Sequence, residues 1–257
     1  MFFLSIAASD SSGSAGIQQD LKMAERTGFW GLNAVTAVTS QSFWEADFIE
    51  IVSEKIFFSQ LKIIFNSFKI SAIKIGVLPK KRFASILLEF LDTVNCPIVY
   101  DPVFKTSSGL ELYEEDPKDI FNIISPKCTV ITPNIPEFEY FFPDLASYFV
   151  SKEYILTDND WTEWILSKQE TGGDYPAIYL KGGHSNEKKI IEYLYHKQSI
   201  TKFEYDRKKW KYSRGTGCSF SSLLSMYLVN NDLKTACRLA NETLVRYYED
   251  IELKDWI

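Results

Sequence analysis

The feature that most constrains the fold is an alternation of buried strands and amphipathic helices that begins at the first residues of the chain. Phe2–Ala8 is a continuous apolar run, a polar loop with two glycines follows, and apolar residues then recur with helical spacing over Ile17–Ala24. Gly28 closes this helix, and Asn33–Thr39 is a second buried strand. Strand, helix and strand in this order predict a βαβ unit with parallel strands.

The same alternation continues along the chain. Phe48–Val52 is only a short apolar segment, whereas Ile190–Tyr195 and Ser199–Tyr205 predict an antiparallel strand pair. Further strands are predicted at Ala72–Leu78, Pro97–Tyr100, Cys128–Thr132 and Ala177–Leu180, and helices after Ser53, from Pro79, from Asp116, at Asp160–Lys168, at Cys218–Leu228 and at Leu233–Tyr248. These patterns predict an α/β fold, a three-layer αβα sandwich with a mostly parallel central sheet. Since no repeat or linker interrupts the chain, we expect a single domain over residues 1–257.

Composition excludes several classes of protein. The net charge of −6 argues against a nucleic-acid surface, so the basic run Arg207–Lys211 is interpreted as a solvated loop. Four scattered cysteines without a Cys-x-x-Cys pair, and only two histidines, His184 and His196, argue against a structural zinc site and favour a reducing cytoplasm. Met1–Ala8 lacks a basic flank and predicts a strand, and no apolar run approaches the ~20 residues that cross a bilayer.

The stretch Arg214–Ser222 has the composition of an anion site. Gly215 and Gly217 flank Thr216, and an apolar run starts immediately afterwards, so a tight loop should lead into the first turn of a helix. The N–H groups of a first helical turn have no partner within the helix, and together with the helix dipole they attract negative groups such as phosphate. The alternative is a glycine-rich loop that only turns the chain.

Six other polar loops follow predicted strands or contain polar residues at strand ends. In parallel sheets ligands gather at the carboxyl ends of the strands, so these loops predict a substrate site along one rim. The chain contains neither G-x-G-x-x-G nor G-x-x-x-x-G-K-[ST], which disfavours a Rossmann dehydrogenase or a P-loop NTPase. The loops are Asp10–Gly16, Gln41, Gly76, Asp101, Asn134–Glu137 and Lys181–His184.

Seven sequence blocks follow one another along the chain: Ala8–Asp20, Val35–Gln41, Ile73–Gly76, Asp101–Val103, Thr132–Glu137, Lys181–His184 and Gly215–Cys218. In this order they resemble the ribokinase-like superfamily and, within it, the hydroxymethylpyrimidine and phosphomethylpyrimidine kinases of thiamine biosynthesis. The resemblance extends over essentially the whole chain and is specific because all seven blocks occur in one order.

The resemblance implies ATP and Mg²⁺ as cofactors and phosphorylation of the pyrimidine hydroxymethyl group and then of its monophosphate. Phosphoryl transfer depends mainly on positioning and charge stabilisation, so Gly215, Thr216 and Gly217 would supply backbone donors. Cys218 stands where the wider superfamily has an aspartate base, and the helix N-terminus could lower the pKa of its thiol. A base role predicts that Cys218→Ala lowers kcat far more than it raises the KM for ATP. Alternatively, Cys218 shapes the pocket and the alcohol loses its proton late.

The resemblance also assigns binding roles. Gln41 offers a donor and an acceptor to an aminopyrimidine, although it could be an ordinary surface glutamine. Lys181 faces ATP phosphates unless it forms a surface salt bridge. The residues that would line or support the pyrimidine pocket are Ala15, Asp20, Gln41, Val77 and Val103, although the small and apolar ones among them could simply be packing. Those that would bind ATP are Asn134, Lys181 and Arg214, and those that would hold Mg²⁺ through water are Asp101 and Glu137.

Several residues depart from the family pattern. Ala8 and Ser14 stand where glycine is common, Val77 where methionine often covers the pyrimidine, and Arg214 where a histidine frequently precedes the glycine. These departures concern substrate detail, so a pyridoxal kinase of the same superfamily is the nearest alternative, and a non-catalytic binding protein of the same fold is a second. The family also implies a cytoplasmic homodimer.

Overall fold

The computed structural model describes residues 1–105, 109, 111–151, 176–182, 189–197, 199–211 and 213–252, and the side chains of residues 148–151 are not considered. The strands are β1 (Phe2–Asp10), β2 (Trp30–Gln41), β3 (Ala46–Ile51), β4 (Ile70–Ile75), β5 (Ile98–Tyr100), β6 (Val130–Ile131), β7 (Ala177–Leu180), β8 (Lys189–His196) and β9 (Ser199–Asp206). The helices are α1 (Gly16–Arg26), α2 (Glu54–Ser67), α3 (Lys81–Leu91), α4 (Pro117–Ile124), the short 3₁₀ helix η1 (Ser125–Lys127), α5 (Ile135–Phe141), α6 (Pro143–Ser151), α8 (Thr216–Tyr227) and α9 (Leu233–Glu252).

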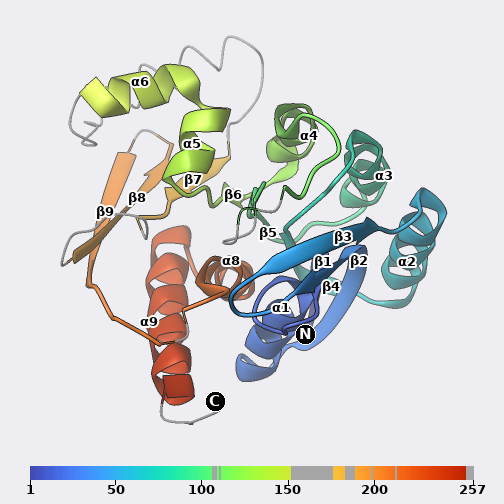
Figure 1. Cartoon of the computed structure of the whole chain (residues 1–257), viewed down its shortest axis with the longest axis horizontal. Helices are drawn as coiled ribbons and strands as arrows, with labels where there is room; N and C mark the ends of the chain where they lie inside the picture. The colour runs from blue at the N-terminus through green and yellow to red at the C-terminus, as the bar shows by residue number, and fades with distance from the viewer. Residues whose placement is uncertain are drawn as a thin grey trace.

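Within these ranges the strands form one nine-stranded sheet in the order β3-β2-β1-β4-β5-β6-β7-β8-β9 (Figure 1). The central strands from β2 to β7 are parallel, and β8 and β9 pair antiparallel at one edge. The prediction of a mostly parallel sheet with a late antiparallel hairpin is therefore confirmed.

The opposite edge carries a strand that the sequence did not predict. β3 pairs antiparallel with β2 over Ala46–Ile51, where we expected only a short apolar segment at Phe48–Val52. Its residues are exposed or half-buried, so the strand lacks the continuous apolar pattern of the central strands. An edge strand is held mainly by its backbone pairing, which a hydrophobic pattern does not report.

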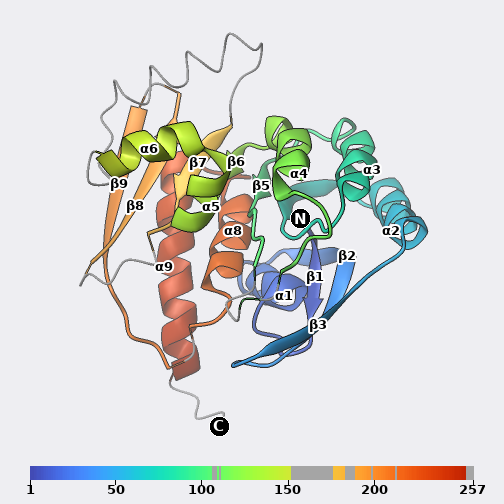
Figure 2. The same ribbon diagram turned by 45° about the horizontal axis from the view of Figure 1, so that its top comes forward.

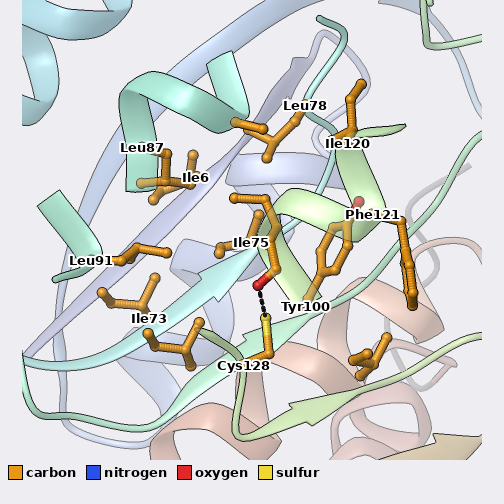
Figure 3. Packing of buried hydrophobic residues seen from close by; sticks show 14 of the residues in the cluster. Ile6, Ile73, Ile75, Leu78, Leu87, Leu91, Tyr100, Ile120, Phe121 and Cys128 are labelled. Atoms are coloured by element: carbon orange, nitrogen blue, oxygen red, sulfur yellow. Dashed lines mark hydrogen bonds between the residues drawn. The ribbon is translucent and has the colours of Figure 1, made fainter. Parts of the chain in front are cut away.

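Side-chain alternation along the central strands builds a core on each face of the sheet. On β1, Leu4 and Ile6 contact the core covered by α2, α3, α4 and α5, whereas Phe3 contacts the core covered by α1, α8 and α9. Figure 2 shows these two groups of helices on opposite faces, and Figure 3 shows Ile6, Ile73 and Ile75 packed beneath α3 and α4. The predicted three-layer αβα sandwich is confirmed.

The helix starts test the capping predictions. The Ser53 side chain accepts a hydrogen bond from the Ile56 N–H and Asp116 accepts one from Lys118, so both are N-caps as predicted. Two expectations were wrong: α3 begins at Lys81 rather than at Pro79, and Asn134 caps a helix where we expected a loop through Glu137.

Other boundaries also shifted. β4 begins at Ile70 and ends at Ile75, whose pairing with Tyr100 is the last in the ladder with β5. Helix α6 occupies part of a region that the sequence left uninterpreted. The predicted helix Asp160–Lys168 and His184 lie outside the described residues. Among the helices that the structure describes, none combines the length and hydropathy needed to cross a membrane.

Candidate active site

The glycine-rich loop leads directly into α8, as predicted. Gly215 is the N-cap residue with φ +77°, and a Cβ at this position would lie 1.8 Å from the Ser14 carbonyl oxygen. A side chain would therefore be excluded by both strain and space. Since glycine offers no side-chain acceptor, the N–H groups of Thr216, Gly217 and Cys218 in the first turn receive no cap from the N-cap residue.

A buried ion pair lies beside this turn. Lys181, directly after β7, donates through Nζ to Asp101 Oδ1 at 2.7 Å, and Asp101, directly after β5, is fully buried. A Cβ on Gly217 would lie 3.4 Å from Lys181 Nζ and 4.0 Å from Asp101 Oδ2, so the turn and the pair share one space. The predictions placed these loops together, and the structure confirms that they meet.

The charges of this pair are mutually stabilised. Burial alone would raise the pKa of Asp101, but Lys181 and Lys74 hold it below its ordinary value. Burial alone would likewise lower the pKa of Lys181, but Asp101 and Glu137 raise it. Lys181 therefore stays a cation at neutral pH, which makes it a suitable partner for an anionic ligand at the first turn of α8.

Asn134 and Glu137 form a capping box at the start of α5. The Asn134 side-chain oxygen accepts from the Glu137 N–H at 2.9 Å, and the Glu137 carboxylate accepts from the Asn134 N–H at 2.8 Å. Burial raises the pKa of Glu137 to about 7. Repulsion from Asp101 adds to this increase, whereas the attraction of Lys181 opposes it. Asn134 also pairs with Lys181 through a parallel backbone bridge, so this helix start belongs to the same rim.

Two buried carboxylates that repel one another form a donor set that suits a divalent cation of the Mg²⁺ type. The oxygens of Asp101 already accept bonds from Lys181, Thr132 and Ser221, which favours contact with the ion through water. No cluster of three or more His, Cys, Asp or Glu side chains that could hold a metal occurs in the described part of the chain. The residues present therefore fit a cation that keeps much of its own hydration.

Asp20 on α1 is held by a network of buried protein donors. It is fully buried and accepts hydrogen bonds from Lys74 at 2.9 and 3.0 Å, from Ser5 at 2.5 Å and from Ser222 at 2.7 Å. Because both carboxylate oxygens accept hydrogen bonds from the protein, Asp20 connects α1 to β1, β4 and α8 and holds these elements together beside the site. These contacts fit a supporting role, one of the two roles that the resemblance implies for Asp20, and a direct contact with the pyrimidine stays a prediction.

Lys74 is a residue to which the sequence analysis assigned no role. It is buried on β4, and a Cβ on Gly76 would lie 3.1 Å from its Nζ. Burial would lower its pKa, but the charge of Asp20, with smaller contributions from Cys218 and Asp101, raises it. A lysine at a buried position of a largely apolar strand is itself a signal, because a buried ammonium requires an acidic partner.

Cys218 lies in the first turn of α8, where its thiol interacts with the Gly16 N–H and feels the charges of Lys74, Asp20 and Asp101. Burial raises the pKa of the thiol to about 11, although Lys74 lowers it. The expectation that the helix N-terminus would bring its pKa toward neutrality is wrong, because desolvation exceeds the attraction of nearby positive charge.

Gln41, at the end of β2, is bonded at both ends of its side-chain amide. Its Nε2 donates to Thr39 Oγ1 at 2.8 Å, and its Oε1 accepts from Arg214 Nη2 at 2.9 Å. Arg214 also donates to the Ser42 carbonyl. The structure thus joins Arg214 to the strand that carries Gln41, a contact that neither residue's sequence context indicates, and a role of Arg214 toward ATP stays a prediction.

The remaining predicted pocket residues lie nearby. Val77 is buried with Ala8 and Ala37, and Val103 packs against the same small cluster. Ala15 is the N-cap residue of α1, and its N–H donates to Asp10 Oδ2 at 2.7 Å. A second unpredicted support is Glu192 on β8, which is buried and accepts from the Gly182 N–H at 3.3 Å next to Lys181.

The mostly parallel sheet, the glycine-led first turn of α8 and the buried Lys181–Asp101 pair are those of an α/β phosphotransferase of the ribokinase-like class. A family model described as phosphomethylpyrimidine kinase matches residues 10–250, and the chain belongs to this family.

Individual relatives agree with this family. The hydroxymethylpyrimidine/phosphomethylpyrimidine kinase of Aquifex aeolicus is 31% identical over 94% of this chain and 92% of its own length. The crystal structure of phosphomethylpyrimidine kinase from Clostridium difficile 630 is 27% identical, with a TM-score of 0.75 over 96% of this chain and 99% of that one. An ADP complex of Bacillus subtilis pyridoxal kinase is 25% identical, with a TM-score of 0.73 over 94% of this chain and 88% of that one.

Proposed function

We propose that this kinase transfers the terminal phosphoryl group of ATP to 4-amino-5-hydroxymethyl-2-methylpyrimidine and then to the resulting monophosphate, in thiamine biosynthesis. The family match and the relatives' names support this activity. The observation that carries it in the structure is the meeting of the α8 first turn with the Lys181–Asp101 pair, where a Cβ on Gly217 would lie 3.4 Å from Lys181 Nζ. We also propose that residues 1–257 act as one domain in a cytoplasmic homodimer.

In this proposal each residue acts on charge or position. The N–H groups of Thr216, Gly217 and Cys218 would bind the transferred phosphoryl group, and Lys181 would neutralise its developing negative charge. Asn134 can still donate through its side-chain amide nitrogen, because only the oxygen is used in the capping box. Bound Mg²⁺ would neutralise phosphate charge next to Asp101 and Glu137, which would hold its waters.

The pyrimidine would lie on the opposite side of the turn. Gln41 would bind the ring, while Val77, Val103 and Ala15 would provide the small apolar wall around it, with Asp20 supporting α1 and α8 from below. In the transfer, a bond forms between the hydroxymethyl oxygen and the γ-phosphorus, the bond from that phosphorus to the β,γ-bridging oxygen breaks, and ADP departs. The hydroxyl proton passes late to a phosphoryl oxygen or to solvent, since burial raises the pKa of the Cys218 thiol to about 11 and disfavours its thiolate as the base.

The test is a coupled ADP-release assay with hydroxymethylpyrimidine, its monophosphate and pyridoxal, compared by kcat/KM. We expect both pyrimidines to exceed pyridoxal by at least about tenfold, which corresponds to ~1.4 kcal/mol of transition-state binding. A wide margin in favour of pyridoxal would instead establish the second candidate, which the Bacillus subtilis fold relative favours. Absence of ADP release with all three compounds would support a non-catalytic role.

A further inference from the structure

The side-chain amide of Gln41 has a single possible orientation in this structure. A guanidinium group can only donate hydrogen bonds, so the Gln41 atom 2.9 Å from Arg214 Nη2 must be the oxygen. The amide nitrogen then donates to Thr39 Oγ1 at 2.8 Å, and the Thr39 hydroxyl donates to the Ser9 carbonyl at 3.1 Å. The hydrogen bonds therefore run in one direction, from Arg214 through Gln41 and Thr39 to the Ser9 carbonyl.

Arg214 and Gln41 are also held in place by hydrogen bonds to and from their backbone neighbours. Arg214 donates through Nη1 to the Ser42 carbonyl, and the Arg214 carbonyl accepts from Tyr248 on α9 at 2.7 Å. The backbone of Gln41 is bracketed by Ser11, which accepts from the Gln41 N–H at 2.9 Å and donates to its carbonyl at 2.8 Å. The guanidinium is thus fixed between the end of β2 and the residue before Gly215, and both side chains are half-buried.

The bonds leave part of the amide available. A glutamine amide has two N–H donors and two acceptor lone pairs, and one of each is used by Thr39 and Arg214. One N–H of Nε2 and one lone pair of Oε1 remain, and Arg214 determines on which side each of them lies. A ring nitrogen next to an exocyclic amine presents the complementary acceptor and donor side by side. If the amide were flipped, its NH₂ group would face the exocyclic amine, donor against donor.

We propose that Arg214 is a positioning residue for the substrate, which fixes the amide of Gln41 in the orientation that accepts an aminopyrimidine edge. The inference rests on the proposed function, because it assigns the ring to Gln41. It places Arg214 on the pyrimidine side of the turn, so Arg214 acts through Gln41 and not through the phosphates of ATP. The guanidinium links the ring-binding strand end to the loop that starts α8.

A double-mutant cycle tests this assignment. Arg214→Ala should raise the KM for hydroxymethylpyrimidine about tenfold or more, since hydrogen bonds to charged groups contribute this much, and should change the KM for ATP by less than about twofold. In a Gln41→Ala background, adding Arg214→Ala should change the KM for the pyrimidine by less than about twofold, because the amide that Arg214 orients is gone. Arg214→Lys should recover part of the affinity, since one ammonium can reach one of the two acceptors.

Arg238→Ala is the matched control, because Arg238 is exposed on α9 and forms an i,i+4 pair with Glu242 on the same helix. It should leave both KM values unchanged. Thermal unfolding of every variant establishes that the proteins are folded, and Arg214→Lys provides the comparison if Arg214→Ala is destabilised.

Two results would overturn the inference alone: effects of Arg214→Ala and Gln41→Ala that multiply independently, or a rise in the KM for ATP that persists without Gln41. The second result would assign Arg214 to the nucleotide. A wild-type protein that does not phosphorylate hydroxymethylpyrimidine would instead overturn the proposed function, and this inference with it. The two failures are therefore distinguishable in the same assay.

Discussion

The buried pair of Asp20 and Lys74 offers the sharpest test of what supports the site. Asp20→Asn keeps the shape of the side chain and one acceptor for Ser5 or Ser222, but it removes the countercharge of a lysine that is 1% exposed. Removing one partner of a buried ion pair typically costs about 3–5 kcal/mol of folding free energy. The variant tests directly whether this network stabilises the packing of α1 against β4 and α8.

The ordinary pKa of lysine sets an upper limit on this cost. An unpaired Lys74 can lose its proton, and neutralising a lysine of ordinary pKa 10.4 at pH 7 costs about 4.6 kcal/mol. Asp101 and Cys218 also act on Lys74, and the charge of Asp101 compensates part of the loss. We therefore expect Asp20→Asn to lower the free energy of unfolding by about 3–4 kcal/mol at pH 7.

The pH dependence gives the prediction a signature. In the wild type the raised pKa of Lys74 provides stability that is fully present below pH ~10.4 and is lost as the pH rises above it. In the variant, burial without Asp20 lowers the pKa of Lys74, so the free-energy cost of burying this lysine is largest at low pH and decreases as the pH approaches 10. The difference in free energy of unfolding between wild type and variant should therefore decrease by up to about 1.4 kcal/mol per pH unit between the lowered pKa and pH 10.

Urea unfolding at pH 7 and pH 9, followed by circular dichroism, measures both quantities. Asp92→Asn is the matched control, because it removes the same charge from an exposed pair with Lys127 at 2.6 Å and should cost less than about 1 kcal/mol. A loss below 1 kcal/mol for Asp20→Asn, or a gap that widens with pH, would refute the reasoning.

Three further predictions concern the loops and helix starts. Gly215→Ala should abolish turnover and lower the free energy of unfolding by several kcal/mol, because its Cβ would clash with Ser14. Gly28→Ala is the control: Gly28 has nearly the same φ of +76° but open space around its Cβ, so the loss in thermal unfolding should be only about 1–2 kcal/mol. Equal losses in the two variants would contradict the clash with Ser14. Glu137→Gln should be about 1–3 kcal/mol more stable than wild type at pH 8, since the raised pKa makes the charged carboxylate costly there, and the difference should vanish near pH 4; a pH-independent difference would exclude this cause. Ser53→Ala should lower the free energy of urea unfolding by about 1 kcal/mol through loss of the α2 cap, and no change would mean that the bond to Ile56 is not formed in solution.

The sequence predicted those features that local pattern determines. Continuous apolar runs located the central strands, and Ser53 and Asp116 were recognised as N-caps because a polar residue preceded a helical apolar pattern. The capping box of Asn134 and Glu137 was equally readable, since proline and glutamate follow the asparagine at the usual spacing, yet the short helix that it starts was interpreted as a loop.

Contacts between distant residues could not be predicted in the same way. Asp20 is 54 positions from Lys74 and 202 from Ser222, and Arg214 is 173 positions from Gln41. These contacts exist because the strand order places β2, β1 and β4 side by side, and because α1 and α8 pack together on one face of the sheet. The motifs indicated that these residues gather at one rim, but which charge faces which depends on side-chain packing that no motif records.

The role of Cys218 is where packing changes the mechanism that the sequence favoured. A thiol with a pKa of about 11 is about 10⁻⁴ ionised at pH 7, so a thiolate base would be scarce when the hydroxymethyl group reacts. A loose phosphoryl-transfer transition state needs little proton removal, which is consistent with a protonated thiol that shapes the pocket. We expect Cys218→Ser to retain kcat within about tenfold and kcat of the wild type to stay nearly constant from pH 7 to 9, because general-base catalysis would contribute about 10²–10⁴ and make kcat rise with the thiolate fraction. Steady-state kinetics of both proteins across this range decides the matter: a tenfold rise of wild-type kcat per pH unit, absent in Cys218→Ser, would restore the thiolate as the base.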